Sequence, residues 1–304
     1  MLRTVIHQRS PRVALALMIA LLVGKANAAN LKPETAKAWD SYLAAAEAQF
    51  QQRLEPGNQF LWVDEDADRR EQVRAGKVLV VSADAQNPRK VPSGLLHNWL
   101  GAAFVPNTTV ASVLATVRDY DHYKDFYQPA VMESKAMPAT GSDDQFSMLL
   151  MNKSVVSKTA LDSNYQITFV RVDGKRYYSI SRATRIQEIE KPGSPEQRIL
   201  PPDQGSGLIW RLASITRFEE RDGGVYIELQ AIALSRDIPG SLHWLVAPIV
   251  RRVSKNSLTM SLQQTATAVQ TESTLAGRTP VRVEASNTGS LGNAKVLAPR
   301  NSFR

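Results

Sequence analysis

Apolar residues recur at helical spacing in three stretches of the sequence. Residues 33–52 begin with a proline, which suits the first position of a helix, and they carry apolar side chains along one face. A second stripe follows Thr108 or Thr109, either of which can cap a helix with its hydroxyl oxygen. The third and longest stripe spans residues 240–269. We therefore expect a helix in each of these stretches.

Between residues 130 and 234 the chain has the pattern of consecutive antiparallel strands. Asp173-Gly174 and Asp222-Gly223 each separate two strand-like runs. Asp-Gly in this context is a strong hairpin signal, because both central residues of a type I′ turn need a positive φ. In the last strand, apolar residues from Val225 to Ala233 alternate with polar ones such as Glu228. This alternation predicts one apolar face and one largely hydrated face.

Residues 94–105 are apolar and rich in branched and aromatic side chains, which is typical of a strand. Two shorter strand-like runs precede them, at residues 60–63 and 78–81, with an acidic-to-basic stretch between. We interpret residues 29–90 as an N-terminal extension that packs on a main domain of residues 91–272. Strands that are collected together, with helices at their flanks, indicate an α+β fold.

Three segments of the chain resemble the START-like (SRPBCC) superfamily, which includes birch-pollen-allergen-like proteins and polyketide cyclases. These segments are the helix and turn of residues 110–131, the two Asp-Gly hairpins, and the junction at residues 233–239 with the following helix. The resemblance covers residues 91–270 and does not account for residues 30–90. It implies a helix-grip fold, in which a curved antiparallel sheet wraps around a long C-terminal helix. It also implies an internal apolar cavity that holds a lipid, sterol, quinone or polyketide.

The first 28 residues have the three parts of a secretory signal peptide. Arginines precede an unbroken apolar run at residues 13–23, and Ala26-Asn27-Ala28 then supplies the small residues of a cleavage site. The apolar run is shorter than the roughly 20 residues that a membrane-spanning helix needs. We therefore expect cleavage after Ala28 and a mature protein that is periplasmic or secreted.

The formal net charge of +8 comes from the two ends of the chain. Without residues 1–28 and 273–304, the numbers of basic and acidic residues are equal. A protein that binds nucleic acid needs a surplus of positive charge, so we expect no nucleic-acid partner. Residues 273–304 lack periodicity and are predicted to form a disordered tail. Their weak positive charge leaves peripheral contact with an anionic membrane open.

Aromatic walls with a few polar groups are typical of sites that bind small molecules. If the implied cavity exists, aromatic residues of the sheet and helices should line it. Arg211 interrupts an otherwise apolar strand, so it faces either water or a ligand, and simple alternation favours water. The candidate residues are Tyr120, Tyr123, Tyr165, Tyr178, Trp210, Arg211 and Trp244.

The sequence shows no constellation of catalytic residues. It has no cysteine, no Gly-x-Ser-x-Gly, no Gly-x-Gly-x-x-Gly and no Walker motif, and its histidines are not at metal-ligand spacing. We therefore expect no metal and no cofactor. An enzyme on this fold would need a buried polar group in the cavity, for which Tyr165, Arg211 and His97 are the first candidates.

These patterns together favour an exported, non-enzymatic carrier or sensor of a hydrophobic small molecule. Two alternatives stay open: a cyclase- or dehydratase-like enzyme on the same fold, and a scaffold that binds another component of the cell envelope. The sequence specifies neither the ligand nor the oligomeric state.

Overall fold

The computed structural model describes residues 29–153, 158–206, 209–237 and 240–278. Within the last helix it describes side chains from Arg252 to Thr274. The predicted signal peptide and the chain beyond Arg278 lie outside the described residues. No helix in the described ranges is both long enough and apolar enough to cross a bilayer.

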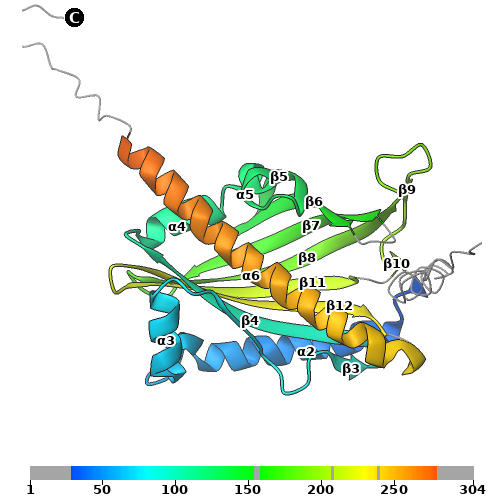
Figure 1. Cartoon of the computed structure of the whole chain (residues 1–304), viewed down its shortest axis with the longest axis horizontal. Helices are drawn as coiled ribbons and strands as arrows, with labels where there is room; N and C mark the ends of the chain where they lie inside the picture. Colours follow the sequence, from blue (N-terminus) through cyan, green and yellow to red (C-terminus); the bar gives the residue numbers. More distant parts are fainter. Residues whose placement is uncertain (1–28, 154–157, 207–208, 238–239, 279–304) are drawn as a thin grey trace, which may run out of the picture.

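A large antiparallel sheet forms the middle of the molecule (Figure 1). Its main strand order is β2-β4-β12-β11-β8-β7-β6-β5, while β3 pairs with β4 and β9 pairs with β8. Two short strands, β1 and β10, pair separately. The bounds are β1 Ala29–Asn30, β2 Leu79–Ser82, β3 Arg89–Val91, β4 Gly94–Pro106, β5 Val131–Thr140, β6 Asp143–Lys153, β7 Lys158–Arg171, β8 Arg176–Glu190, β9 Arg198–Ile199, β10 Gln204–Gly205, β11 Arg211–Arg221 and β12 Gly224–Arg236.

Helices lie on both faces of this sheet. The three predicted helices are present, and the last continues to Arg278, nine residues beyond the expected end. Thr109 caps the second, because its side chain accepts a hydrogen bond from the Ser112 backbone N–H. The bounds are α2 Pro33–Gln52, η1 Trp62–Glu65, α3 Ala67–Arg74, α4 Val110–Val117, η2 Tyr120–His122, α5 Tyr123–Phe126 and α6 Gly240–Arg278.

The long helix α6 crosses one face of the sheet (Figure 1). Leu258, Leu262 and Val269 on α6 pack into one apolar cluster with residues of β4, β12 and α4. Gly101 of β4 permits this close approach, because a Cβ there would lie 2.6 Å from Leu262 Cδ1. The chain therefore has an α+β fold in which an antiparallel sheet packs against a long C-terminal helix, as the sequence predicts.

The N-terminal segment covers the opposite face of the sheet. Phe50 of α2 and Val73 of α3 pack with residues 60–63 onto β4, β11 and β12. A second cluster joins the first half of α2 to the other end of the same strands. The prediction of a hydrated face on β12 is therefore wrong, because Tyr226 and Glu228 are completely buried beneath this layer. The fold has three layers, with the sheet in the middle.

A buried ion pair joins the N-terminal segment to the sheet. Arg217 and Glu228 are direct neighbours on β11 and β12, and Arg217 Nη2 lies 3.1 Å from Glu228 Oε2. The Glu228 carboxylate also accepts hydrogen bonds from the backbone N–H groups of Trp62 and Val63, at 2.9 and 2.8 Å. Burial raises the pKa of Glu228 and lowers that of Arg217.

Residues 60–74 differ from their predicted structure. Residues 60–63 do not form a strand, because Trp62 and Val63 begin the 3₁₀ helix η1 and donate to Glu228 rather than to a strand. The acidic-to-basic stretch that follows contains the helix α3. Asp66 caps α3, since its side chain accepts a hydrogen bond from the Arg69 backbone N–H. This cap was a local signal that the hydrophobic pattern did not show.

The two Asp-Gly hairpins form by different turns. At Asp222 and Gly223 the φ angles are 56° and 80°, as the predicted type I′ turn requires. Neither Asp173 nor Gly174 has a positive φ, so the same prediction is wrong there. Instead, the Asp173 carboxylate accepts hydrogen bonds from the backbone N–H groups of Lys175 and Arg176, each at 2.8 Å.

Candidate functional site

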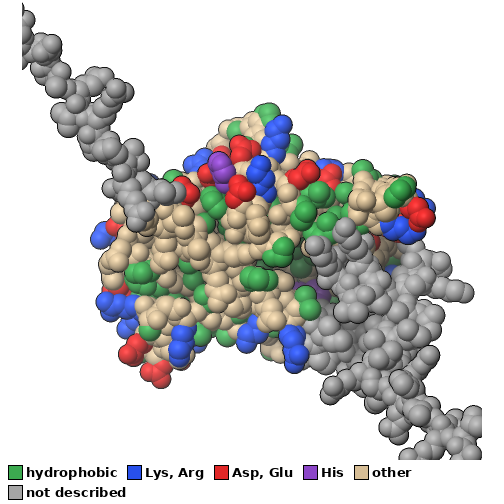
Figure 2. All heavy atoms as spheres, turned by 45° about the horizontal axis from the view of Figure 1, so that its top comes forward, with side chains coloured by type: hydrophobic (Ala, Val, Ile, Leu, Met, Phe, Trp, Pro, Cys, Tyr) green, Lys and Arg blue, Asp and Glu red, His purple; other side chains and the backbone are tan. Residues whose placement is uncertain are grey.

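The face of the sheet beneath α6 has small side chains in its middle and larger ones toward its edges. One cross-strand row consists of Trp99, Ala231, Ser214, Ser181 and Ile167 on five successive strands. Partners in such a row point to the same face, so the two large residues flank three small ones. Hydrophobic side chains gather in the middle of the view that looks onto this side of the molecule (Figure 2).

Four hydroxyl groups occupy the centre of this face. Ser181 pairs with Ser214, and Ser179 pairs with Thr216, so the four residues form a block on β8 and β11. Ser179 and Ser181 are only 2% and 8% exposed. None of the four hydroxyls has a hydrogen-bond partner within the described part of the chain. Ser214 and Thr216 are partly exposed, so water or a ligand can reach these hydroxyls. We call these four residues the hydroxyl block.

An aromatic stack forms one side of the same face. The ring of Phe146 lies between those of Tyr120 and Tyr165, with ring centroids 4.5 and 4.9 Å apart. Tyr123 meets Tyr120 and Phe146 edge to face. Stacked and edge-to-face pairs of this kind hold aromatic rings in fixed positions. The stack therefore provides a rigid apolar wall.

The polar ends of these tyrosines are anchored away from the stack. Tyr120 donates its hydroxyl hydrogen to Asp144 at 2.9 Å, and Arg118 holds the same carboxylate with two hydrogen bonds. Tyr123 donates to the backbone carbonyl of Val117 at 2.5 Å. Burial raises the pKa of Tyr165 to about 12, so this hydroxyl stays protonated at neutral pH. The rings of the aromatic stack are therefore uncharged at neutral pH.

The structure brings together only some of the predicted cavity residues. Tyr120, Tyr123 and Tyr165 form the aromatic stack with Phe146. Tyr178 lies on the opposite face of the sheet, where it packs against Phe50 of α2.

Trp210 and Arg211 are also absent from the face beneath α6. Trp210 packs in the cluster that includes the first half of α2. Arg211 forms an ion pair with Asp203, with Nη2 3.1 Å from Oδ2, which agrees with the alternation argument that it points away from the cavity. The side chain of Trp244 lies outside the described residues.

Sequence reasoning missed Phe146 and the hydroxyl block. Phe146 sits directly opposite Tyr165 on the neighbouring strand, and this register was not available from the sequence. The serines and Thr216 had a weak signal, because they are small polar residues at every second position of two predicted strands. Such a pattern is usually read as a hydrated face, and only the presence of α6 above it changes that interpretation.

The three residues proposed for an enzyme do not form a catalytic site. His97 and Tyr165 share the face beneath α6, but β12, β11 and β8 lie between their strands. Arg211 is on the other face. Within the described residues, no group of three or more histidines and carboxylates is arranged to hold a metal ion.

Buried His97 gives the protein a predicted sensitivity to acid. Burial lowers the pKa of His97 from 6.5 to about 4, and its Nε2 lies 2.9 Å from Ser235 Oγ. Between pH 6.5 and 4 the unfolded chain takes up a proton at His97 and the folded chain does not. The free energy of unfolding should therefore fall by up to about 3 kcal/mol from this residue as the pH drops through that range. Denaturant titrations of the wild type and of His97→Gln at several pH values measure this difference. Parallel curves for the two proteins from pH 6.5 to 4 would contradict it.

No family model matches the sequence, and no curated protein is similar to it in sequence. Solved structures show likeness in fold alone. A STAR-related lipid transfer protein fragment from Xanthomonas axonopodis is 15% identical, with a TM-score of 0.39 over 60% of this chain and 95% of that chain. Human STARD10 is 9% identical, with a TM-score of 0.42 over 75% and 87% of the two chains. The Zhui aromatase/cyclase from Streptomyces is 8% identical, with a TM-score of 0.41 over 60% and 98%.

Proposed function

We propose that this protein is an exported carrier or sensor of a hydrophobic small molecule, which it holds between α6 and the sheet. The observation that carries this proposal is the hydroxyl block: two buried and two partly exposed hydroxyl groups that have no partner among the described residues and lie beside a rigid aromatic wall. Buried polar groups normally have hydrogen-bond partners, so such a block fits a ligand or water that supplies them.

The chemistry of this face indicates the class of ligand. The aromatic stack suits a flat or ring-containing apolar body, whereas the hydroxyl block suits a hydroxyl or carbonyl group on it. Neither the block nor the stack carries a charged side chain, and an unpaired ionic group would be costly to bury against them. We therefore favour an uncharged ligand of the sterol, quinone or polyketide type over a phospholipid whose charged headgroup enters the cavity.

We favour a binding protein over an enzyme for the following reason. Among the described residues, the polar groups of this face do not include a nucleophile and a general base that a third residue holds in position. His97 is the residue of this face that most resembles a general base. Among the described residues, its side chain forms a hydrogen bond only with Ser235. Export rests on the signal-peptide pattern of residues 1–28.

Native mass spectrometry of the protein from an export-competent host, followed by solvent extraction, tests this proposal directly. We expect a chain that begins at Ala29 and carries an extractable apolar molecule. In the double variant Ser181→Leu/Ser214→Leu, two added isobutyl groups should fill the space. We expect the bound molecule to be lost, with binding of a hydrophobic fluorescent probe weakened about tenfold or more.

The matched control is Ser257→Leu, which makes one such substitution at an exposed position of α6. It should bind the ligand and the probe like the wild type. The double variant should remain folded, because leucine in an apolar space between sheet and helix is tolerated if room is available. Undiminished binding in a folded double variant would refute the proposed site.

A further inference from the structure

His97 and Trp99 are neighbours on the face of β4 that lies beneath α6. They are two positions apart on this strand, so their side chains point to the same side of the sheet. Successive residues on one face of a strand are about 7 Å apart, so a small group between the two rings can contact both. Neither residue belongs to the hydroxyl block or to the aromatic stack.

Trp99 carries a hydrogen-bond donor that has no acceptor. Its indole nitrogen Nε1 is buried and forms no hydrogen bond within the described part of the chain. The residue as a whole is only partly buried, so the ring lies at the border of the core and not deep inside it. Buried N–H groups normally have a partner, so this donor fits an acceptor that a ligand supplies.

His97 carries an acceptor that has no donor. Its side chain is only 7% exposed, and its Nε2 lies 2.9 Å from Ser235 Oγ. The Ser235 hydroxyl donates its one hydrogen to the Arg236 carbonyl at 3.3 Å, so its oxygen accepts from His97 Nε2. The ring is neutral at pH 7, because burial lowers its pKa to about 4, and its Nδ1 therefore carries a lone pair. Among the described residues, Nδ1 has no partner.

The neighbouring strand β12 has small side chains beside these two rings. Ala233 is the partner of His97, and Ala231 is the partner of Trp99. Both alanines are partly exposed, although β12 is an inner strand of the sheet. Water or a ligand can therefore reach the surface beside the two rings.

From these observations we infer that His97 and Trp99 bind a hydroxyl group of the hydrophobic ligand, an inference that rests on the function proposed for this face. A hydroxyl donates its hydrogen to His97 Nδ1 and accepts a hydrogen bond from the Trp99 N–H with the same oxygen. A carbonyl or ether oxygen only accepts, so it would leave Nδ1 unpaired. The two residues therefore select an alcohol or a phenol, such as a sterol, over a quinone that has no hydroxyl.

Calorimetric titration of the purified protein with 2-naphthol and with 2-methoxynaphthalene tests this inference. The two probes share one flat apolar ring system, but the methyl ether has no hydrogen to donate. We expect the wild type to bind 2-naphthol about tenfold more tightly than the ether.

The double variant His97→Gln/Trp99→Phe should lose this preference. Glutamine still reaches Ser235 but has no atom in the place of Nδ1, and phenylalanine keeps an aromatic ring without an N–H. We expect the affinities of the variant for the two probes to agree within about twofold. Its affinity for the ether should match that of the wild type, which also shows that the variant is folded.

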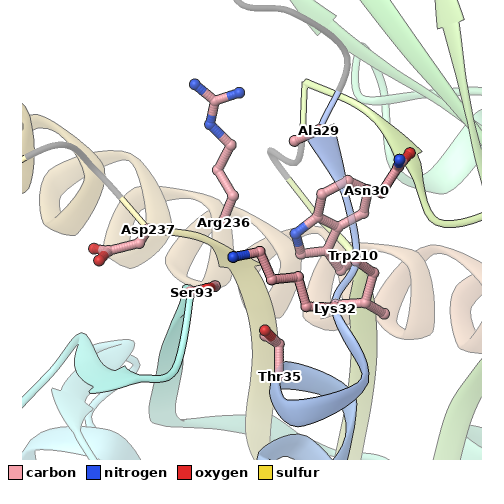
Figure 3. A pocket seen from close by; sticks show the side chains of 9 residues that line it. Ala29, Asn30, Lys32, Thr35, Ser93, Trp210, Arg236 and Asp237 are labelled. Atoms are coloured by element: carbon pink, nitrogen blue, oxygen red, sulfur yellow. The ribbon is translucent and has the colours of Figure 1, made fainter.

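Trp210→Phe is the matched control. Trp210 packs on the other face of the sheet and lines a separate pocket of about 340 Å³ at the start of α2 (Figure 3). This variant should keep the wild-type preference for 2-naphthol. Equal affinity of the wild type for the two probes overturns the inference but leaves a hydrophobic site in place. A preference that the double variant keeps, or that Trp210→Phe also loses, does the same. If neither probe binds to the wild type, both the inference and the proposed function fail.

Discussion

Replacing Glu228 with alanine should lower the free energy of unfolding by about 3–5 kcal/mol. The change leaves the buried guanidinium of Arg217 without its counter-charge and removes the acceptor for the backbone N–H groups of Trp62 and Val63. A buried ion whose partner is removed costs more than the pair contributed, because its charge remains without solvent. Urea titration followed by tryptophan fluorescence measures the loss.

Two further variants test whether the loss comes from the buried, unpaired charge of Arg217. Lys191 and Glu196 also form an ion pair, but both side chains are more than 60% exposed. Glu196→Gln should therefore leave the free energy of unfolding unchanged within the error of the measurement. The double variant Arg217→Met/Glu228→Leu removes both charges and should recover part of the stability lost in Glu228→Ala. A loss of less than about 1 kcal/mol in Glu228→Ala would show that the ion pair does not hold the layers together.

Deleting residues 29–74 should abolish cooperative folding of the rest of the chain. This deletion removes α2, η1 and α3, which bury the whole outer face of β4, β11 and β12. The remaining sheet would expose a large apolar surface together with an ion pair that no longer has its cover. The buried side chains of that face include Leu96, Leu100, Ile215, Tyr226, Ile232 and Leu234.

Near-ultraviolet circular dichroism and thermal unfolding detect the consequence of this deletion. We expect no fixed tertiary signal and a strong tendency to aggregate. The tail predicted to be disordered was residues 273–304, but α6 includes residues 273–278. Deleting the rest of that predicted tail, residues 279–304, should leave the transition unchanged. A cooperative transition in the protein without residues 29–74 would mean that the main domain is complete by itself, and that the N-terminal segment is an accessory.

The local elements of this fold were largely predictable from the sequence, whereas its layers were not. The helix at 33–52 follows from its periodicity, and the strand at 94–105 from its apolar, branched and aromatic composition. The burial of Glu228 does not, because a carboxylate in an alternating strand normally faces water. Its partners Trp62 and Val63 lie 165 or more residues away, and nothing in either segment shows that they meet.

The candidate site was likewise predictable from the sequence only in part. Tyr120, Tyr123 and Tyr165 could be expected in an aromatic wall, since they belong to the segments that form the grip. Tyr178 has the same side chain and a similar setting, but the pleat places it on the opposite face. A shift of one position along a strand moves a side chain from the face proposed for the ligand to the face packed against the N-terminal segment. Only the register of strand pairing distinguishes these two placements.

The attachment of residues 60–63 to β12 also sets an order of events during synthesis. The carboxylate that receives the N–H groups of these residues is made about 165 residues after them. Until β11 and β12 have paired, the apolar segment from α2 to α3 has no surface on which to dock. Until then a newly made chain exposes the apolar side chains of this segment, which raises its tendency to aggregate before it folds.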